Sequence, residues 1–251
     1  MFSFPDISQQ NLKTFKKSGF LLLPNAFDKN AMKEIIKWTD EVAKLPEISG
    51  RQWVYHEKSI KNENKLISRI ENISPFHSGY NKLAQILLKP ATQLLGEKAV
   101  LFKEKINFKM PGGDGFKPHQ DAQAGWNKYA NFFVSILISI DEATVENGCL
   151  QVVEGHHDTG LFQSWRPLNE KEMSGMVFSP IPTKPGDVIF FDCFAPHASE
   201  PNLTESVRRI YYATYNKLSE GDNLNDYYAD KHQTYPPDID RKTGKTYVFR
   251  V

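Results

Sequence analysis

The spacing of apolar residues changes near residue 98, and this change limits the chain to folds that combine N-terminal helices with a later antiparallel sheet. Upstream, apolar side chains recur at three- and four-residue steps, as on one face of a helix. Downstream, they alternate along short segments bounded by glycine and proline. Helices first and many short strands later predict an α+β protein with an antiparallel sandwich or barrel core.

The N-terminal part predicts three helices and one buried strand. The first helix spans residues 8–19, and a short extended apolar segment, residues 20–23, follows it. A second helix begins after the capping residue Asp28 and ends before Pro46. Residues 78–95 form the third helix, with leucine and isoleucine on one side. These helices are expected to flank the sheet.

Alternation is clearest over residues 131–141, which present one apolar face and one mixed face. The apolar face suits packing under helices, whereas the mixed face can line a cavity. The apolar face consists of Phe132, Val134, Ile136, Ile138 and Ile140, and the mixed face of Phe133, Ser135, Leu137 and Ser139. Further strands are predicted over residues 99–110, 149–154, 187–193 and 208–216.

Composition excludes several classes of function. The 31 basic and 30 acidic residues give a formal charge of +1, so the chain lacks the basic field that nucleic-acid binding requires. Its 2 cysteines are too few for a disulfide framework or a structural zinc site and favour a reducing compartment. No apolar run reaches the length of a membrane span. We therefore expect a soluble cytoplasmic protein, monomer or homodimer, that binds no membrane.

A short motif, His119-Gln120-Asp121, follows a glycine-rich turn. Residues at i and i+2 of a strand point to the same side, so an imidazole and a carboxylate converge there. They supply two of the three ligands of the facial triad that binds Fe(II) in non-haem oxygenases. The motif alone is weak, because residues 156–158 repeat it as His-His-Asp.

Two further features lie downstream at the spacing that such a site needs. His197 follows a predicted strand and is the candidate third ligand, although a lone histidine there is more often hydrogen-bonded to backbone. Arg208 and Arg209 begin an aromatic strand, on which only one of them can face the interior. A buried guanidinium needs an anionic partner, and its planar fork suits a carboxylate. A surface arginine pair is the alternative.

Four blocks in one order resemble the phytanoyl-CoA dioxygenase family over roughly residues 10–235. They are Lys105-Ile-Asn-Phe-Lys-Met-Pro-Gly-Gly, Pro118-His-Gln-Asp, Asn147-Gly-Cys-Leu-Gln-Val-Val-Glu-Gly-His and the region from Pro185-Gly-Asp through His197-Ala-Ser to Arg208. The resemblance implies a double-stranded β-helix (jelly roll, cupin-like) core with flanking N-terminal helices. Residues 1–251 are expected to form a single domain, with a helical part to about 97, the core to about 235 and a C-terminal tail.

The resemblance also implies cofactors and residue roles. It implies Fe(II), with 2-oxoglutarate and O2 as cosubstrates, and it places His119, Asp121 and His197 as the metal ligands. Arg208 takes the position that pairs with the distal carboxylate of 2-oxoglutarate. The weaker candidates for cosubstrate contact are Ser199, Lys109 and Asn107, with Lys105 as an open alternative in the same block. Because Asp121 is a carboxylate, where halogenating relatives carry a small residue, halogenation is disfavoured.

The implied reaction is hydroxylation of an unactivated C–H bond in a small molecule, with release of succinate and CO2. Family members with a similar block act on amino acids, aminophosphonates, other zwitterions or secondary metabolites. An acyl-CoA is disfavoured, because no clustered basic patch is evident in the sequence. Segment 47–77 is predicted as a mobile covering loop. The candidate substrate wall consists of Trp126, Tyr129, Phe133, Arg51 and Trp53, with Arg51, Arg69 or Arg166 for an acidic end.

Two other functions remain open at this point. One is a catalytically silent jelly roll that binds a metal and a small ligand; the other is a zinc hydrolase that uses the same ligands. Neither explains Arg208, because a binder or a hydrolase has no need of an arginine for the cosubstrate. The aromatic residues of the candidate wall have their own alternative, which is ordinary packing in the core.

Overall fold

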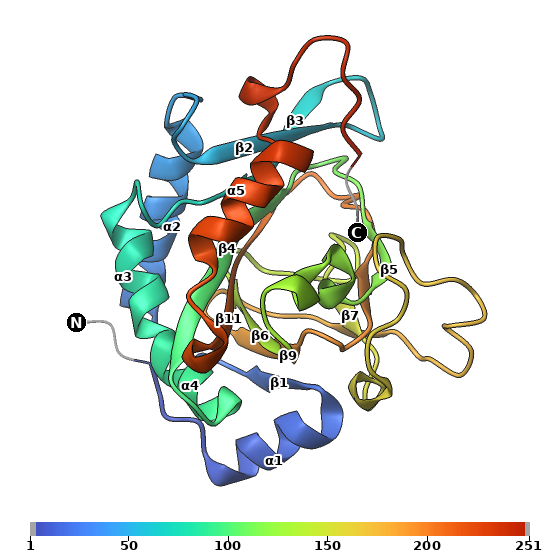
Figure 1. Cartoon of the computed structure of the whole chain (residues 1–251). Coiled ribbons are helices and arrows are strands. Elements are labelled where there is room, and N and C mark those ends of the chain that lie inside the picture. Colours follow the sequence, from blue (N-terminus) through green and yellow to red (C-terminus); the bar gives the residue numbers. More distant parts are fainter. Residues whose placement is uncertain (1–3, 249–251) are drawn as a thin grey trace.

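A computed structural model describes residues 4–248 and contains two antiparallel sheets (Figure 1). In the seven-stranded sheet the order is β1-β9-β6-β11-β4-β3-β2, and in the four-stranded sheet it is β5-β10-β7-β8. The strands of the larger sheet are β1 (Phe20–Leu23), β2 (Trp53–Lys58), β3 (Lys65–Glu71), β4 (Ala99–Lys109), β6 (Phe133–Ser139), β9 (Val188–Asp192) and β11 (Arg208–Lys217). Those of the smaller sheet are β5 (Phe116–His119), β7 (Leu150–Val152), β8 (Ser179–Ile181) and β10 (His197–Ser199).

Four N-terminal helices cover the outer face of the larger sheet (Figure 1). They are α1 (Gln9–Ser18), α2 (Lys29–Lys44), α3 (Ser78–Ile86) and α4 (Leu88–Leu95). The Ser8 hydroxyl accepts the Asn11 N–H at the start of α1, and the Asp28 carboxylate accepts two N–H groups at the start of α2. The first two predicted helices, and the strand between them, are therefore confirmed.

The alternation over residues 131–141 has the predicted consequence. On the outer face of β6, Val134, Ile136 and Ile138 are fully buried in the main core with residues of the helices. On the inner face, Ser135 and Leu137 face the smaller sheet's side, where Leu137 packs with residues of β7 and β9. The mixed face thus lies between the two sheets, where the candidate site is built.

Segment 47–77 is not the mobile covering loop that the weak pattern predicted. It forms the hairpin β2–β3, whose strands pair antiparallel and extend the larger sheet beyond β4. The residues nearest the core are buried and those toward the turn are exposed, so apolar residues occupy only one end of each strand. That gradient hides the alternation that identifies a strand.

The third predicted helix is two helices. Hydrogen bonding changes at Leu87, between α3 and α4, and Pro90 has no N–H with which to continue the ladder of α3. The sequence also gave no sign of α5 (Leu224–Thr234), which is weakly amphipathic, or of the short strands β5, β8 and β10. Single-turn 3-10 helices complete the fold: η1 (Asp121–Ala124), η2 (Trp126–Lys128), η3 (His157–Thr159), η4 (Leu218–Glu220) and η5 (Asp238–Asp240).

No helix within residues 4–248 combines the length and the apolar character needed to cross a bilayer.

Candidate metal centre and cavity

Three predicted metal ligands meet between the sheets. His119 ends β5 and His197 begins β10, and the two residues are direct partners in the antiparallel ladder. Asp121 follows in η1, with an oxygen 4.0 Å from Nε2 of His197. The ligand atoms of the three residues all lie within 4.8 Å of one another. Two imidazoles and one carboxylate at this spacing fit a divalent metal ion that retains open coordination positions.

Backbone contacts orient both imidazoles for metal binding. Nδ1 of His119 donates to the Lys117 carbonyl at 2.7 Å, and Nδ1 of His197 donates to the Ala195 carbonyl at 3.0 Å. Each contact fixes the tautomer whose Nε2 carries a lone pair. Burial lowers the pKa of His119 to about 3 and also lowers the pKa of His197, so both rings are neutral. Neutral histidines with free Nε2 atoms are ready metal ligands.

Asp121 is oriented by a hydroxyl from the larger sheet. Ser135 on β6 donates to Oδ2 of Asp121 at 3.0 Å, and the Ser135 hydroxyl lies 3.0 Å from that of Thr214 on β11. Burial opposes ionisation of Asp121, but the basic side chains around it outweigh burial, so the pKa of Asp121 is lowered. The carboxylate is therefore ionised and held in place from behind, as ligating carboxylates commonly are.

Arg208 and Arg209 point to opposite sides, as the strand geometry predicted. Arg209 binds Asp141, at 2.7 Å from Nε, and Asp40 on the helical side. Arg208 is only 2% exposed, and among the described residues its Nε has no hydrogen-bond partner. Burial lowers its pKa, with Tyr212 acting in the opposite direction. A buried guanidinium with an orphaned donor fits an anion that arrives with a ligand.

Two other candidate residues lie beside Arg208. Lys109 is its ladder partner on β4, and Nζ of Lys109 donates to the Ser199 hydroxyl at 2.8 Å and to the Glu200 carbonyl. Ser199 and Asn107 line the cavity described next, and Oδ1 of Asn107 is buried without a partner among the described residues. The structure thus brings Asn107, Lys109, Ser199 and Arg208 to one end of the site.

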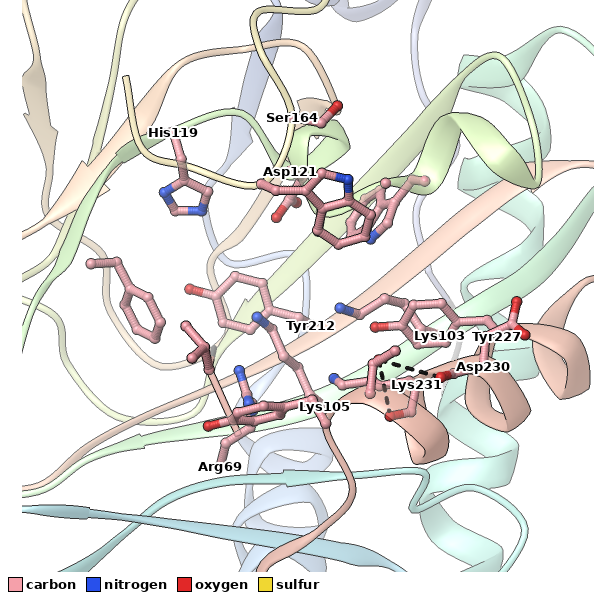
Figure 2. A pocket seen from close by; sticks show the side chains of 18 of the residues that line it. Arg69, Lys103, Lys105, His119, Asp121, Ser164, Tyr212, Tyr227, Asp230 and Lys231 are labelled. Atoms are coloured by element: carbon pink, nitrogen blue, oxygen red, sulfur yellow. Dashed lines mark hydrogen bonds between the residues drawn. The ribbon is translucent and has the colours of Figure 1, made fainter. Parts of the chain in front are cut away.

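A cavity of about 810 Å³ opens over the three ligands (Figure 2). Of the candidate substrate residues, Trp126 and Tyr129 line it, as does Arg69. Arg51, Trp53 and Phe133 do not. Arg51 lies over the Phe76 ring at 5.9 Å, while Trp53 and Phe133 are buried in a neighbouring aromatic cluster, so their packing alternative describes them better. Arg166 is also engaged elsewhere, in an ion pair with Glu172.

Basic residues gather in this cavity, contrary to the expectation that no basic patch exists. Lys103 and Lys105 come from β4, Arg69 from β3 and Lys231 from α5, and all four line the wall. Glu71, which is fully buried, forms ion pairs with Arg69 at 2.8 Å and with Lys231 at 2.5 Å. These cations are far apart in the sequence and become a cluster only in the folded sheet. The amino-acid sequence itself shows only the alternate spacing of the lysines on β4.

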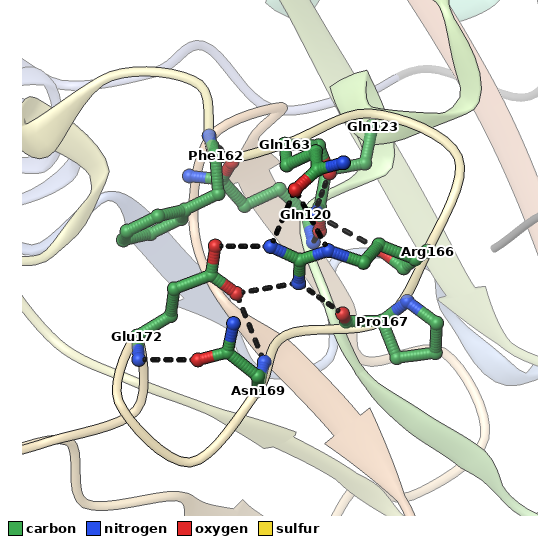
Figure 3. A network of polar contacts seen from close by, with 8 residues as sticks. All are labelled: Gln120, Gln123, Phe162, Gln163, Arg166, Pro167, Asn169 and Glu172. Carbon is green, nitrogen blue, oxygen red and sulfur yellow. Dashed lines mark hydrogen bonds and ion pairs between the residues drawn. The ribbon is translucent and has the colours of Figure 1, made fainter.

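Two glutamines that the sequence reasoning passed over anchor a loop at the cavity mouth. Gln120 donates to the carbonyls of Gly160 and Phe194. Gln123 donates to the carbonyls of Gln163 and Arg166 (Figure 3). The loop so held carries Ser164 and Trp165 to the cavity. Because Gln120 and Gln123 flank Asp121, the metal-ligand segment and the mouth loop form one hydrogen-bonded unit.

The second His-x-Asp motif, residues 156–158, does not line the cavity and packs against the end of α1. His157 donates through Nε2 to the Lys16 carbonyl at 3.1 Å and packs against Gly19, where an added Cβ would lie 2.6 Å from the ring. Within residues 4–248, only His119, Asp121 and His197 form a group of three potential ligands.

Fold and donor set together define a class: oxygenases that hold a non-haem metal with two histidines and one carboxylate. Comparison with known sequences narrows the class to a family. The chain belongs to the phytanoyl-CoA dioxygenase family, whose model matches residues 15–210, and it is an oxygenase. The family resemblance and the enzyme class predicted from the sequence are confirmed.

Two relatives match nearly the whole chain. A 2-aminoethylphosphonate dioxygenase from an uncultured bacterium is 35% identical over 244 residues, which cover 96% of this chain and 93% of that protein. The methylphosphonate hydroxylase of Gimesia maris is 34% identical over 233 residues, covering 91% and 88%. The crystal structure of EctD from S. alaskensis with 2-oxoglutarate and 5-hydroxyectoine matches with a TM-score of 0.74 at 23% identity, covering 88% of this chain and 80% of that chain. This likeness confirms the antiparallel, cupin-like fold.

Proposed function

We propose that the protein is an Fe(II)- and 2-oxoglutarate-dependent dioxygenase that hydroxylates a C–H bond of a small phosphonate. The relatives named for 2-aminoethylphosphonate and methylphosphonate support the substrate class. The observation that carries the proposal is the convergence of His119, Asp121 and His197 in a cavity whose opposite wall is basic. A phosphonate is a compact anion, so a cationic wall facing the metal site suits it.

In this proposal, His119, Asp121 and His197 hold the iron. Their contacts with the Lys117 and Ala195 carbonyls and with Ser135 keep the three ligands in place before the metal arrives. When bound, Fe(II) with 2-oxoglutarate and O2 supplies the oxidising power that inserts oxygen into a C–H bond, with succinate and CO2 as coproducts. The protein's own task is to place the target bond beside the metal.

Arg208 binds the distal carboxylate of 2-oxoglutarate in this proposal, and Ser199 and Asn107 bind along its length. Arg208 does not line the cavity; it is buried beside Lys109, which contacts Ser199, and its Nε lacks a hydrogen-bond partner among the described residues, which leaves a donor for an anionic ligand. Lys109 positions Ser199 through their 2.8 Å hydrogen bond. A catalytically silent binder or a zinc hydrolase would leave this buried arginine without a role.

We further propose that strands β4 to β11 form a double-stranded β-helix and that residues 1–251 are one catalytic domain. Along the chain from β4 to β11, successive strands alternate between the two sheets except for β7 and β8, which pair with each other in the smaller sheet, as in two linked Greek keys. Strands β1, β2 and β3 extend the same larger sheet at its two edges, which ties the N-terminal part to the core.

The proposal is tested by two measurements on the full chain. Anaerobic addition of Fe(II) and 2-oxoglutarate should produce the visible metal-to-ligand charge-transfer absorption. In air, succinate release should then depend on a phosphonate when methylphosphonate and 2-aminoethylphosphonate are compared with amino acids and other small amines. A folded protein that shows neither the absorption nor substrate-dependent succinate release would rule the proposal out.

A further inference from the structure

Two lysine side chains that line the cavity, one buried and one half-buried, have no carboxylate bound to them among the described residues. Lys103 is only 7% exposed, and its Nζ lies 4.9 Å from the centre of the Trp126 ring and 5.3 Å from that of Tyr227. Nζ of Lys105 lies 4.9 Å from the centre of the Tyr212 ring. Within residues 4–248, neither group forms an ion pair or a hydrogen bond. Aromatic faces lie against both groups and offset part of their desolvation.

The carboxylates around the two lysines already have other partners. Glu71 binds both Arg69 and Lys231, so its charge is divided between two cations. Asp121 is committed to the candidate metal centre. At the mouth, Asp230 is occupied by Lys128 and by the Tyr129 hydroxyl. None of these carboxylates is therefore committed to Lys103 or Lys105, and burial lowers the pKa of both lysines, to about 7 for Lys105, so an anion bound here would stabilise their protonated forms.

The two lysines share one face of β4, because residues at i and i+2 of a strand point the same way. Their side chains reach into the cavity from the wall opposite His119 and Asp121 (Figure 2). A further donor lines the same cavity: Nε1 of Trp126 is buried without a hydrogen-bond partner among the described residues. Unsatisfied donors that converge on one cavity call for an acceptor with several oxygens.

We propose that Lys103 and Lys105 form a subsite for a tetrahedral dianion, which holds the phosphonate group of the substrate on the wall facing the metal. This assignment rests on the proposed function. Lysine ammoniums are compact point charges that suit the three oxygens of a phosphonate, whereas the planar fork of Arg208 suits a carboxylate. The two acidic ligands of the reaction, substrate and 2-oxoglutarate, are thereby sorted to different parts of the site.

Glu71, Arg69 and Lys231 serve this subsite as positioning residues. Their buried ion pairs tie β3 to α5 below the two lysines, and Arg69 lies 4.5 Å from the centre of the Tyr55 ring. These ion pairs hold Arg69 and Lys231 in the basic wall, whereas Lys103 and Lys105 on β4 form no ion pair among the described residues. The protonated Lys103 and Lys105 side chains are thus available to a ligand and are not neutralised by an ion pair within the described protein.

The test is calorimetric binding of methylphosphonate to the full chain under anaerobic conditions, with and without Fe(II) and 2-oxoglutarate. We expect Lys103→Met and Lys105→Met each to weaken binding about tenfold to 100-fold, since each removes one charge-assisted contact. Binding should persist without iron, because the subsite lies on the opposite wall. Methanesulfonate, a tetrahedral monoanion, should bind more weakly. The matched control is Lys98→Met, at an exposed position one residue before β4. Wild-type affinity in both cavity variants would overturn the assignment.

Two further arms separate the alternatives. Lys103→Arg keeps the charge and should retain most of the affinity; a loss equal to that of Lys103→Met would assign the effect to packing and overturn the subsite. If Lys105→Met raises the Kd of 2-oxoglutarate and leaves that of methylphosphonate unchanged, Lys105 belongs to the cosubstrate and the subsite is wrong. If methylphosphonate binds in a lysine-dependent way but no phosphonate stimulates succinate release, the subsite stands and the proposed hydroxylation fails.

Discussion

His119 and His197 are direct partners across β5 and β10, and the centroids of their rings lie 4.2 Å apart. Residues 78 positions apart in the sequence thus become neighbours through the pairing of two short strands. Any change that shifts this register by one residue would turn one imidazole away from the other. The metal centre therefore depends on the strand pairing as much as on the ligands themselves.

Replacing a ligand should abolish iron binding without unfolding the protein. In Asp121→Ala we expect the charge-transfer absorption to disappear and succinate release to fall at least about 100-fold. Metal content after desalting gives an independent readout. Ser135→Ala, which removes only the hydroxyl behind Asp121, should weaken iron binding less. Iron bound at full stoichiometry in Asp121→Ala would show that Asp121 is not a ligand.

Arg208→Lys should raise the KM for 2-oxoglutarate about tenfold to 100-fold, because an ammonium cannot form the two parallel hydrogen bonds of a guanidinium. The neighbouring residue supplies the control. Arg209→Lys alters an ion pair with Asp141 on the other side of the strand and should leave that KM unchanged. The measurement is succinate release as a function of 2-oxoglutarate concentration, and equal KM values in the two variants would contradict the role of Arg208.

Glu71→Gln should lower the free energy of unfolding by about 3–5 kcal/mol, because it leaves Arg69 and Lys231 buried without their shared carboxylate. Urea denaturation measures the loss. Adding Lys231→Met removes one of the stranded charges, so the double variant should recover part of it. A single variant as stable as the wild type would mean that water already compensates these charges.

Stability should fall as the pH rises through 7, in part because of Glu104. Burial raises the pKa of Glu104 from 4.5 to about 7, although its carboxylate accepts the N–H groups of Ile73 and Ser74. Between these values the folded protein binds the proton that the unfolded chain has released, so the contribution to stability is complete below pH 4.5 and lost above 7. The loss amounts to about 3 kcal/mol at most. In urea denaturation, the free energy of unfolding of the wild type minus that of Glu104→Gln should therefore decrease from pH 5 to pH 8. A constant difference would refute the raised pKa.

Gly125→Ala should displace Trp165 from the cavity mouth. Gly125 has a φ of 77°, and an added Cβ would lie 2.3 Å from the indole ring of Trp165. We expect the KM for the prime substrate to rise several-fold. Gly175→Ala has the same backbone penalty, with a φ of 81°, but nothing within 4 Å, and should leave KM unchanged. In a Trp165→Ala background the Gly125 substitution should have no further effect on KM.

The first two helices, the strands β4, β6, β9 and β11, and the family were predictable because each has a local or ordered signal. Capping residues and three- to four-residue periodicity marked α1 and α2, and strict alternation marked β6. Four sequence blocks in one order carried the oxygenase assignment, which the family match confirms. The roles of the three metal ligands and of Arg208 are proposals, although the structure brings the three ligands together as predicted.

Features that depend on long-range contacts could not be predicted from the sequence. Strands β5 and β10 are too short for alternation to show, and the β2–β3 hairpin is apolar at one end only. The basic cluster draws on β3, β4 and α5, so no stretch of sequence contains it. Gln120 and Gln123 looked like ordinary polar neighbours of Asp121, because their partners lie about 40 residues downstream.

The basic wall belongs to the larger sheet and α5, whereas His119 and His197 belong to the smaller sheet. This division allows the two halves of the enzyme to diverge at different rates. Substitutions at Lys103, Lys105 or Lys231 can exchange one acidic compound for another, or for a neutral one, while the two histidines, Arg208 and the cosubstrate residue Asn107 are inherited unchanged. Enzymes for new substrates would accordingly be sought by randomising the residues of the basic wall and leaving His119 and His197 unchanged.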